Sequence, residues 1–236
     1  MFKKTLLAAG IAGAALFGVQ ATAQAASHSE GDSFQFPGEF SANVGFVSDY
    51  RFRGFTQADS EPAIQGGFDW SHDSGVYLGV WGSNVEFNDA HIETDFYGGF
   101  ANEIESFSYD VGLLYYAYPG SSDRFNFNFL EGYVGLGYDF DVAAVSIGAA
   151  YSPDFFGGTG DALYSNAGVS IPLPGEFALD AGIGYQMIEQ GSPVTDWSIG
   201  LSKSFLGFDF SVSYVDTDQN VVGADATVVF AVSRSF

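Results

Sequence analysis

The segment SDYRFRGF at residues 48–55 places two arginines beside an aspartate, with aromatic residues between the charges. Cations next to aromatic rings suit stacking on nucleic-acid bases, whereas opposed charges suit an ion pair or a charged ring in a pore. The whole chain has only 7 Lys and Arg against 29 Asp and Glu, a formal net charge of −22 at pH 7. This balance argues against nucleic acid as a partner, and against binding to an anionic membrane surface through a basic face. The role of Asp49, Arg51 and Arg53 therefore depends on the element that carries them.

The three histidines form no catalytic or metal-binding pattern. His28, His72 and His91 are far apart in sequence, and none can be placed beside a serine nucleophile with an orienting acid. A G-x-S-x-G motif is absent from the sequence. The acidic stretches 58–61 and 216–220 lack the spacing of a dedicated Ca²⁺ loop. We therefore expect no enzyme activity, no cofactor and no metal site.

Residues 1–25 have the pattern of a cleaved secretory signal peptide. Lys3 and Lys4 precede an apolar run over 6–19, and Ala23-Gln24-Ala25 supplies the small residues that signal peptidase needs. Cleavage after residue 25 would leave 5 basic residues against 29 acidic ones, a net charge of −24. The absence of cysteine excludes a lipid-anchored lipoprotein and a disulfide-stapled secreted domain.

The rest of the chain combines export with a composition that is unusual for a soluble domain. It is 47% hydrophobic and 17% aromatic, with 31 glycines and only 15% charged residues, and after residue 19 no apolar run could form a transmembrane helix. An exported, aromatic, glycine-rich chain without such a helix indicates a β-barrel in the outer membrane of a Gram-negative bacterium. We expect residues 26–38 to be a flexible periplasmic leader and residues 39–236 to be the barrel.

The final stretch, ADATVVFAVSRSF, shows the period of two that a barrel strand requires. Ala226, Val228, Phe230, Val232 and Phe236 share one parity, and mostly polar or small residues occupy the other. A last strand that ends in an aromatic residue resembles the signal that the barrel-assembly machinery recognises, and we expect this machinery to be a partner.

The same alternation recurs along the chain and predicts an all-β, antiparallel up-and-down barrel. The large apolar residues would face lipid, and the small and acidic ones would line a tight polar lumen. Connections at alternate junctions are short, as periplasmic turns are, which places both chain ends in the periplasm. We expect about 12 strands, with 10 or 14 as errors of counting, near 40–52, 62–72, 75–87, 91–104, 106–118, 125–138, 141–152, 161–171, 176–188, 194–204, 207–216 and 224–236.

On this map the opening segment is the external end of the first strand. The parity predicts that Asp49, Arg51 and Arg53 point into the lumen. Buried charges should be paired, and the expected partners of the two arginines are Asp69, Asp95, Asp225 and Asp49 itself. The expected residues of the lumen and its constriction are Asp49, Arg51, Arg53, Asp69, Asp95, Asp110, Glu131 and Asp225. The expected aromatic girdle at the membrane interfaces is Tyr50, Phe52, Tyr77, Trp197, Phe208, Tyr214 and Phe236. The charge pairs would either lock the barrel or form a selective constriction, and the two roles can coexist.

The segment from Ser48 to Phe87, with its S-D-Y-x-x-R-G core, and the motif YYAYPG at 115–120 resemble the proteobacterial family of TorF-type porins. This family was long described as a conserved family of unknown function. The resemblance covers essentially the whole chain after the signal peptide. It implies an outer-membrane barrel of porin type, and it implies no catalytic residues and no particular substrate.

The expected function is passive diffusion of small solutes through a narrow acidic lumen, with a preference for cationic or neutral ones. The lumen partners would be small solutes, and the outer wall and loops would contact outer-membrane lipid and lipopolysaccharide. Tyr116 and Tyr118, inward by parity, could offer a sliding surface or could fill space. The alternative is a structural barrel plugged by its own side chains. The loop 152–161, with glycines beside two phenylalanines, leaves open whether a gate folds inward.

Overall fold

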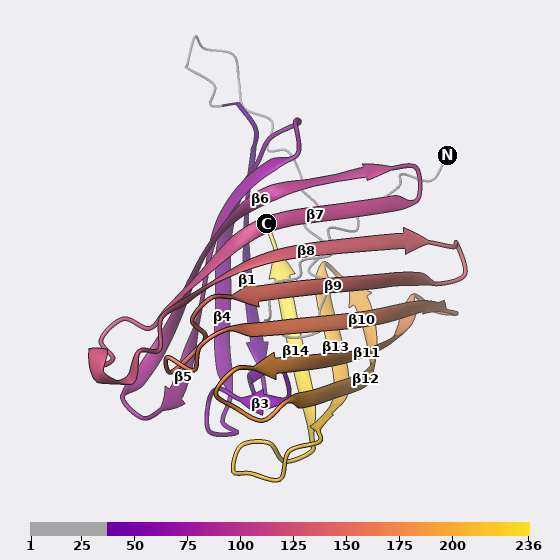
Figure 1. Ribbon diagram of the computed structural model, residues 1–236. Helices are drawn as coiled ribbons and strands as arrows, with labels where there is room; N and C mark the ends of the chain where they lie inside the picture. The colour runs from indigo at the N-terminus through magenta and orange to yellow at the C-terminus, as the bar shows by residue number, and fades with distance from the viewer. Residues whose placement is uncertain (1–36) are drawn as a thin grey trace.

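The computed structural model describes residues 37–236, so the expected signal peptide and nearly all of the expected leader lie outside the described residues. Twelve antiparallel strands form a closed barrel in which every strand pairs with its neighbours in sequence, apart from a small inner hairpin (Figure 1). β1 closes the barrel by pairing with both β4 and β14. The predicted fold class and strand number are confirmed. None of the helices in the described part of the chain could cross a membrane.

The barrel strands are β1 (Glu39–Val47), β4 (Ala63–Ser71), β5 (Val76–Phe87), β6 (Ala90–Ile104), β7 (Phe107–Ala117), β8 (Phe129–Asp139), β9 (Ala144–Ser152), β10 (Ala162–Leu173), β11 (Phe177–Ile188), β12 (Val194–Phe205), β13 (Phe208–Thr217) and β14 (Thr227–Ser235). Two further strands, β2 (Arg51–Phe52) and β3 (Phe55–Thr56), pair only with each other. A single turn of 3₁₀ helix, η1 (Asp123–Phe125), lies between β7 and β8.

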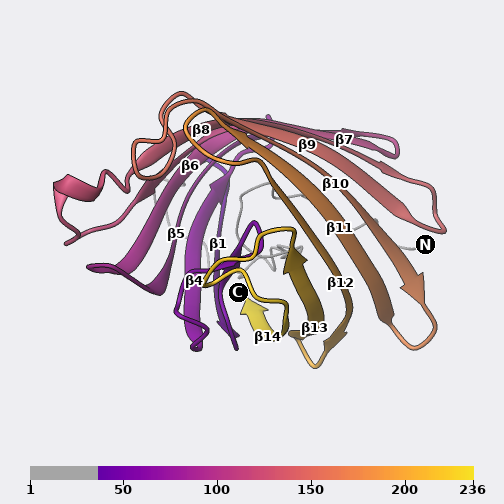
Figure 2. The same ribbon diagram turned by 60° about the horizontal axis from the view of Figure 1, so that its bottom comes forward.

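The two ends of the barrel differ in the length of their connections. Turns of two to four residues join β4 to β5, β6 to β7, β8 to β9, β10 to β11 and β12 to β13, at the end where β1 begins and β14 stops. We call this the short-turn end. The opposite, long-loop end carries residues 48–62, 118–128, 153–161, 189–193 and 218–226, together with one short turn, 88–89, between β5 and β6. Figure 1 shows the loop with η1 and the loop before β14 at this end, and Figure 2 shows how the wall curves from β4 round to β14.

The strands have one apolar face and one small or polar face, and the apolar face is the outer one. In β13, Phe208, Phe210, Val212 and Tyr214 are exposed, whereas the residues between them are Asp or Ser and are more buried. Exposed aromatic and aliphatic side chains on the outside of a closed sheet are typical of a barrel whose surrounding solvent is lipid.

Glycine on the inner face makes room for tyrosine from a neighbouring strand. A Cβ atom on Gly112 would overlap the ring of Tyr133, and one on Gly184 would overlap the ring of Tyr164. At these positions glycine thus allows inward-pointing tyrosine side chains to pack against the wall.

The first barrel strand is shorter than predicted, and this changes the position of the opening segment. β1 ends at Val47, and residues 48–62 turn into the barrel instead of continuing along its wall. Arg51 pairs with Thr56 and Phe52 with Phe55, so Arg53 and Gly54 form a two-residue turn. Their φ angles of 49° and 88° are those of a type I′ turn, which matches the twist of a tight hairpin.

The strand expected near 125–138 begins later than predicted. β8 begins only at Phe129, because residues 123–128 form η1 and a loop, and its pairing with β7 is regular. A register shift lies between Asn84 and Phe87 of β5, next to the long-loop end.

Candidate functional site

The inner hairpin, defined as residues 48–57, occupies the interior of the barrel at the long-loop end. Asp49, Tyr50, Arg51 and Arg53 are each at most 7% exposed. Charged side chains are rarely this deeply buried unless they are paired. The hairpin therefore forms part of the barrel interior, and its polar contacts define the candidate site.

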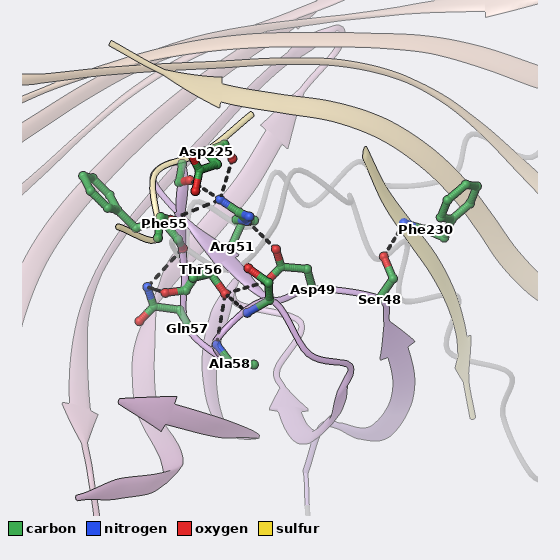
Figure 3. Close-up of polar contacts among 12 residues, drawn as sticks. Ser48, Asp49, Arg51, Phe55, Thr56, Gln57, Ala58, Asp225 and Phe230 are labelled. Atoms are coloured by element: carbon green, nitrogen blue, oxygen red, sulfur yellow. Dashed lines mark hydrogen bonds and ion pairs between the residues drawn. The ribbon is translucent and has the colours of Figure 1, made fainter. Parts of the chain in front are cut away.

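Arg51 anchors the base of the hairpin to the loop that precedes β14 (Figure 3). Its Nε donates to Asp49 Oδ2 at 2.6 Å, and its Nη1 donates to the carbonyl oxygens of Gly54, Gly223 and Asp225 at 3.1–3.2 Å. Thr56 Oγ1 donates to the other oxygen of Asp49 at 2.7 Å. The Asp49 carboxylate and the Arg51 guanidinium thus neutralise each other's charge. Through Arg51 they also hold the hairpin turn at Gly54 and the loop at residues 223–225 in place.

Two predictions about this region were wrong in part. Asp225 lies before β14, its side chain is exposed, and it meets Arg51 through its carbonyl oxygen instead of its carboxylate. Tyr50 and Phe52 were expected to face lipid, but Tyr50 is 1% exposed and Phe52 packs edge-on against Tyr116 inside the barrel. The parity that predicted them assumed a continuous strand, and that strand ends at Val47.

Arg53, at the tip of the hairpin, contacts the opposite part of the wall. Its Nη2 donates to both carboxylate oxygens of Glu131 in β8, at 2.8 and 2.9 Å. Its guanidinium lies over the ring of Tyr164 in β10, 4.2 Å from the centroid, and over that of Phe52 at 4.6 Å. Such cation–π contacts gain strength in a desolvated setting. Among the described residues, the Nε and Nη1 atoms of Arg53 have no hydrogen-bond partner.

Glu93 in β6 joins the hairpin to a third part of the wall. Tyr50 Oη donates to Glu93 Oε1 at 2.6 Å, and Tyr118 Oη donates to Glu93 Oε2 at 2.7 Å. Asp95, two residues further along β6, is 3% exposed, and its Oδ1 has no partner in residues 37–236. The long-loop half of the interior therefore contains four buried wall carboxylates, Glu93, Asp95, Glu131 and Asp196, and two arginines from one hairpin.

Towards the short-turn end, tyrosine hydroxyl groups satisfy half-buried carboxylates. Tyr97 donates to Asp69 at 2.5 Å, and Tyr77 donates to Asp110 at 2.7 Å and also meets Tyr133. The prediction of Tyr77 as a girdle residue was wrong, because Val76 and Leu78 take the outer face and leave Tyr77 on the inner one. The other expected girdle residues, Trp197, Phe208, Tyr214 and Phe236, are exposed on the outer wall.

The tyrosine–carboxylate pairs were missed at the level of sequence, although a signal for them exists. Tyr77, Tyr97 and Tyr133 share the parity of small and acidic residues in their strands, which is the inner parity. The size of a tyrosine favours the lipid face, but its phenolic hydroxyl can hydrogen-bond to a carboxylate inside a polar lumen, so the inner parity indicates an inward tyrosine.

The loop between β9 and β10 folds over the same interior. Phe155 is 8% exposed, packs edge-on against Phe129 with 4.9 Å between ring centroids, and lies beside Arg53. Phe156 stacks on Phe127 with the centroids 4.7 Å apart. This loop thus lies over the hairpin tip. It folds inward, which the sequence had left open for residues 152–161.

Tyr116 and Tyr118 are packed and do not form an open surface. Tyr116 is 1% exposed, stacks on Phe129 at 4.1 Å and donates to Glu131 at 3.2 Å. Both side chains fill space in this structure. Within residues 37–236, no group of His, Asp and Glu side chains is arranged to hold a metal ion.

The chain belongs to the family described as bacterial proteins of unknown function, Gcw_chp, whose model matches residues 30–236. No curated protein matches the chain. The match agrees with the resemblance in describing a bacterial family of unknown function over essentially the whole chain after the expected signal peptide, and it does not test the TorF-type name.

Solved structures of similar fold are outer-membrane porins and channels. The KdgM porin and the NanC porin each have a TM-score of 0.55 and 10% identity, covering 83% and 82% of this chain and 98% and 97% of theirs. The COG4313 outer membrane channel from Pseudomonas putida F1 has a TM-score of 0.52 and 10% identity, covering 89% of this chain and all of that one. At such identities the likeness concerns the fold: this is a barrel of the outer-membrane porin type.

Proposed function

We propose that the protein is an outer-membrane channel for passive diffusion of small solutes, with a preference for cationic and neutral ones. One observation supports this above the others: carboxylates greatly outnumber cations on the inner face of the barrel. The inner-face cations are Arg51 and Arg53, and the inner-face carboxylates are Asp49, Asp69, Glu93, Asp95, Asp110, Glu131, Asp180, Asp196 and Asp209.

The excess of carboxylates favours cations for an electrostatic reason. A narrow passage with low-dielectric walls focuses the field of its charges, so it concentrates counter-ions and repels ions of the same sign. One similar structure is a KdgM porin in complex with oligogalacturonate, which is a polyanion. The charge balance of the present chain disfavours a solute of that kind.

The second candidate is a barrel plugged by its own side chains, and the burial of the inner hairpin favours it. Tyr50, Tyr116 and Glu93 are at most 2% exposed, so water does not reach them in this conformation. A conducting state then requires the hairpin tip or the loop over it to move, whereas a purely structural barrel requires no such movement.

Conductance of the refolded protein in a planar bilayer, under a KCl gradient, tests the channel. Discrete current steps and a reversal potential on the cation side are expected. Anion preference would contradict the proposed selectivity, and a folded barrel that stays silent at all voltages would leave only the plugged alternative.

A disulfide between hairpin and wall tests the movement. An added Cβ on Gly54 would lie 3.0 Å from the Cβ of Thr217, close to the range of about 3.5–4.5 Å that a disulfide needs. The native chain has no cysteine, so G54C/T217C contains a single possible bridge. Oxidation should reduce current and a reductant should restore it, with G54C alone as the control. Equal current in both states would show that the hairpin does not move to open the channel.

The proposal includes the partners expected of such a barrel. The exposed terminal strand β14, ending beside Phe236, is the segment that would be read by the barrel-assembly machinery, and the long loops would meet lipopolysaccharide. The exposed apolar outer wall supports a position in the outer membrane.

A further inference from the structure

Five Lys and Arg residues lie in the described part of the chain, and two of them are on the outer wall at the short-turn end. Arg51 and Arg53 are inside the barrel, and Arg124 is in the loop at the long-loop end. Lys203 lies directly opposite Phe177 and Phe210, and Arg234 lies opposite Val44. Because directly opposed residues in a ladder share a face, and these three partners are exposed, both cations belong to the outer face.

Aromatic rings hold both cations at the wall. Lys203 Nζ is 4.5 Å from the centroid of Phe177, and the Arg234 guanidinium is 5.1 Å from that of Phe208 and 5.3 Å from that of Phe236. The ion pairs within residues 37–236 are Arg51–Asp49, Arg53–Glu131 and His91–Glu86, so neither outer cation has a carboxylate partner there.

An apolar groove of about 510 Å³ runs along the outer wall from Lys203. It crosses β11 to β14 and reaches β1, and its outward-facing lining includes Phe46, Leu201, Phe210, Val212 and Phe230. A groove that is apolar along its length and ends at an ammonium group has the polarity of a phospholipid, with the acyl chain along the wall and the phosphate at the cation.

The turn beside the groove carries a charge of the opposite sign. Glu176 is exposed and directly precedes Phe177, the residue paired with Lys203. A headgroup that places an ammonium next to its phosphate can bind Lys203 and Glu176 together. A primary ammonium can also donate hydrogen bonds to the carboxylate, whereas a quaternary one cannot.

We propose that Lys203, Arg234 and the groove between β11 and β1 bind a phospholipid with a primary-amine headgroup, phosphatidylethanolamine, from the leaflet at the short-turn end. Lys203 and Arg234 donate to its phosphate, and Glu176 accepts from its ammonium. This binding requires the outer wall to lie in a membrane, and it does not require the barrel to conduct.

Native mass spectrometry of the refolded, detergent-solubilised protein tests the assignment with phosphatidylethanolamine, phosphatidylcholine and phosphatidylglycerol added singly. The wild type should retain phosphatidylethanolamine best. K203Q/R234Q should lose retained lipid severalfold, and E176Q should lower phosphatidylethanolamine to the level of phosphatidylcholine. R124Q, which removes a cation at the other end of the barrel, is the matched control.

Two results would overturn the proposal. Unchanged lipid retention in K203Q/R234Q would show that the outer cations do not bind phosphate. Equal retention of the three lipids by the wild type would show that the wall is coated without selection by headgroup. Heat-modifiable migration on gels verifies the folding of each variant. The substituted residues are on the surface of the barrel. If the double variant folds poorly, the single variant K203Q gives the same comparison.

Discussion

Arg53 and Glu131 form an ion pair across the interior of the barrel, in which one guanidinium nitrogen lies 2.8 and 2.9 Å from the two carboxylate oxygens. Each side chain is 3% exposed. The two residues lie 78 positions apart in sequence, one at the tip of an inner hairpin and the other on β8. This pair holds the hairpin against the wall, so it is the first contact to break in a test of gating.

Replacement of Arg53 by alanine should release the hairpin tip and open the long-loop end. The change leaves Glu131 buried without its counter-charge, which typically costs about 3–5 kcal/mol. We expect R53A to show a severalfold higher conductance in planar bilayers and a lower unfolding temperature. R53M/E131Q, which removes both charges and keeps most of the volume, should recover stability. Native conductance in R53A, with the barrel folded, would contradict a closing role for the hairpin.

The two tyrosine hydroxyl groups that donate to Glu93 should each contribute to the stability of the folded barrel. Y50F and Y118F each remove one donor to the buried Glu93 carboxylate. A hydrogen bond to a charged group contributes about 1.5–3 kcal/mol, so each variant should unfold at lower denaturant concentration. The control is Y109F, because Tyr109 donates no hydrogen bond to a carboxylate in residues 37–236. An effect of Y109F as large as that of Y50F would contradict this assignment.

Asp69 and Asp110 should carry part of the cation preference. Both lie in the short-turn half of the interior, where they are half-buried and accept from tyrosine hydroxyl groups. D69K or D110K replaces a negative charge in the proposed passage by a positive one and should move the reversal potential in a KCl gradient towards the anion side. D141K, in an exposed turn, makes the same change of net charge outside the barrel. A similar shift in D141K would mean that the effect is not located in the lumen.

The barrel could be predicted from sequence because period-two patterning is local. β13 and β14 can be read directly from alternating residues such as Phe208 and Asp209. The inward direction of Arg51 and Arg53 was also predicted, and Asp49 was among the expected partners, whereas Glu131 as the partner of Arg53 was not. Pairing inside a barrel depends on which strands face each other across the lumen, and a single chain does not encode this in its periodicity.

The inner hairpin shows why the remaining part of the site was missed. The run from Asp49 to Phe52 resumes the alternation of β1 after a break at Val47 and Ser48, where an apolar residue takes the inner parity and a polar one the outer parity. This break was one signal that the strand ends. The turn at Arg53 and Gly54 was the other, because a glycine in a short polar turn permits the positive φ of a tight hairpin.

Substitution of Gly112 should test the packing of tyrosine over glycine. A Cβ at this position would meet the ring of Tyr133 and the backbone carbonyl of Gly98. Since the backbone cannot yield as a flexible side chain can, overpacking of this kind costs about 1–3 kcal/mol. G112A should therefore lower the unfolding temperature. Gly132, where an added Cβ would lie 3.6 Å from Leu113, is the control, and G132A should unfold close to the wild type.

The seam between β1 and β14 makes Phe236 important for closure of the barrel. Phe236 donates its amide to the carbonyl of Ala42 at 2.8 Å and accepts from the amide of Ala42 at 3.2 Å, which extends the short ladder from Asn43 to Val47. Its side chain is 63% exposed, so it adds little packing to the folded barrel. F236S should then retain the refolded stability of the wild type in detergent. Under the proposed partnership, in which the barrel-assembly machinery reads the terminal side chain, it should reduce the amount of folded barrel in the outer membrane of expressing cells. Deletion of Phe236 removes the two backbone bonds as well and should lower stability in vitro. If F236S reached the membrane at the wild-type level, the terminal aromatic side chain would have no role in assembly.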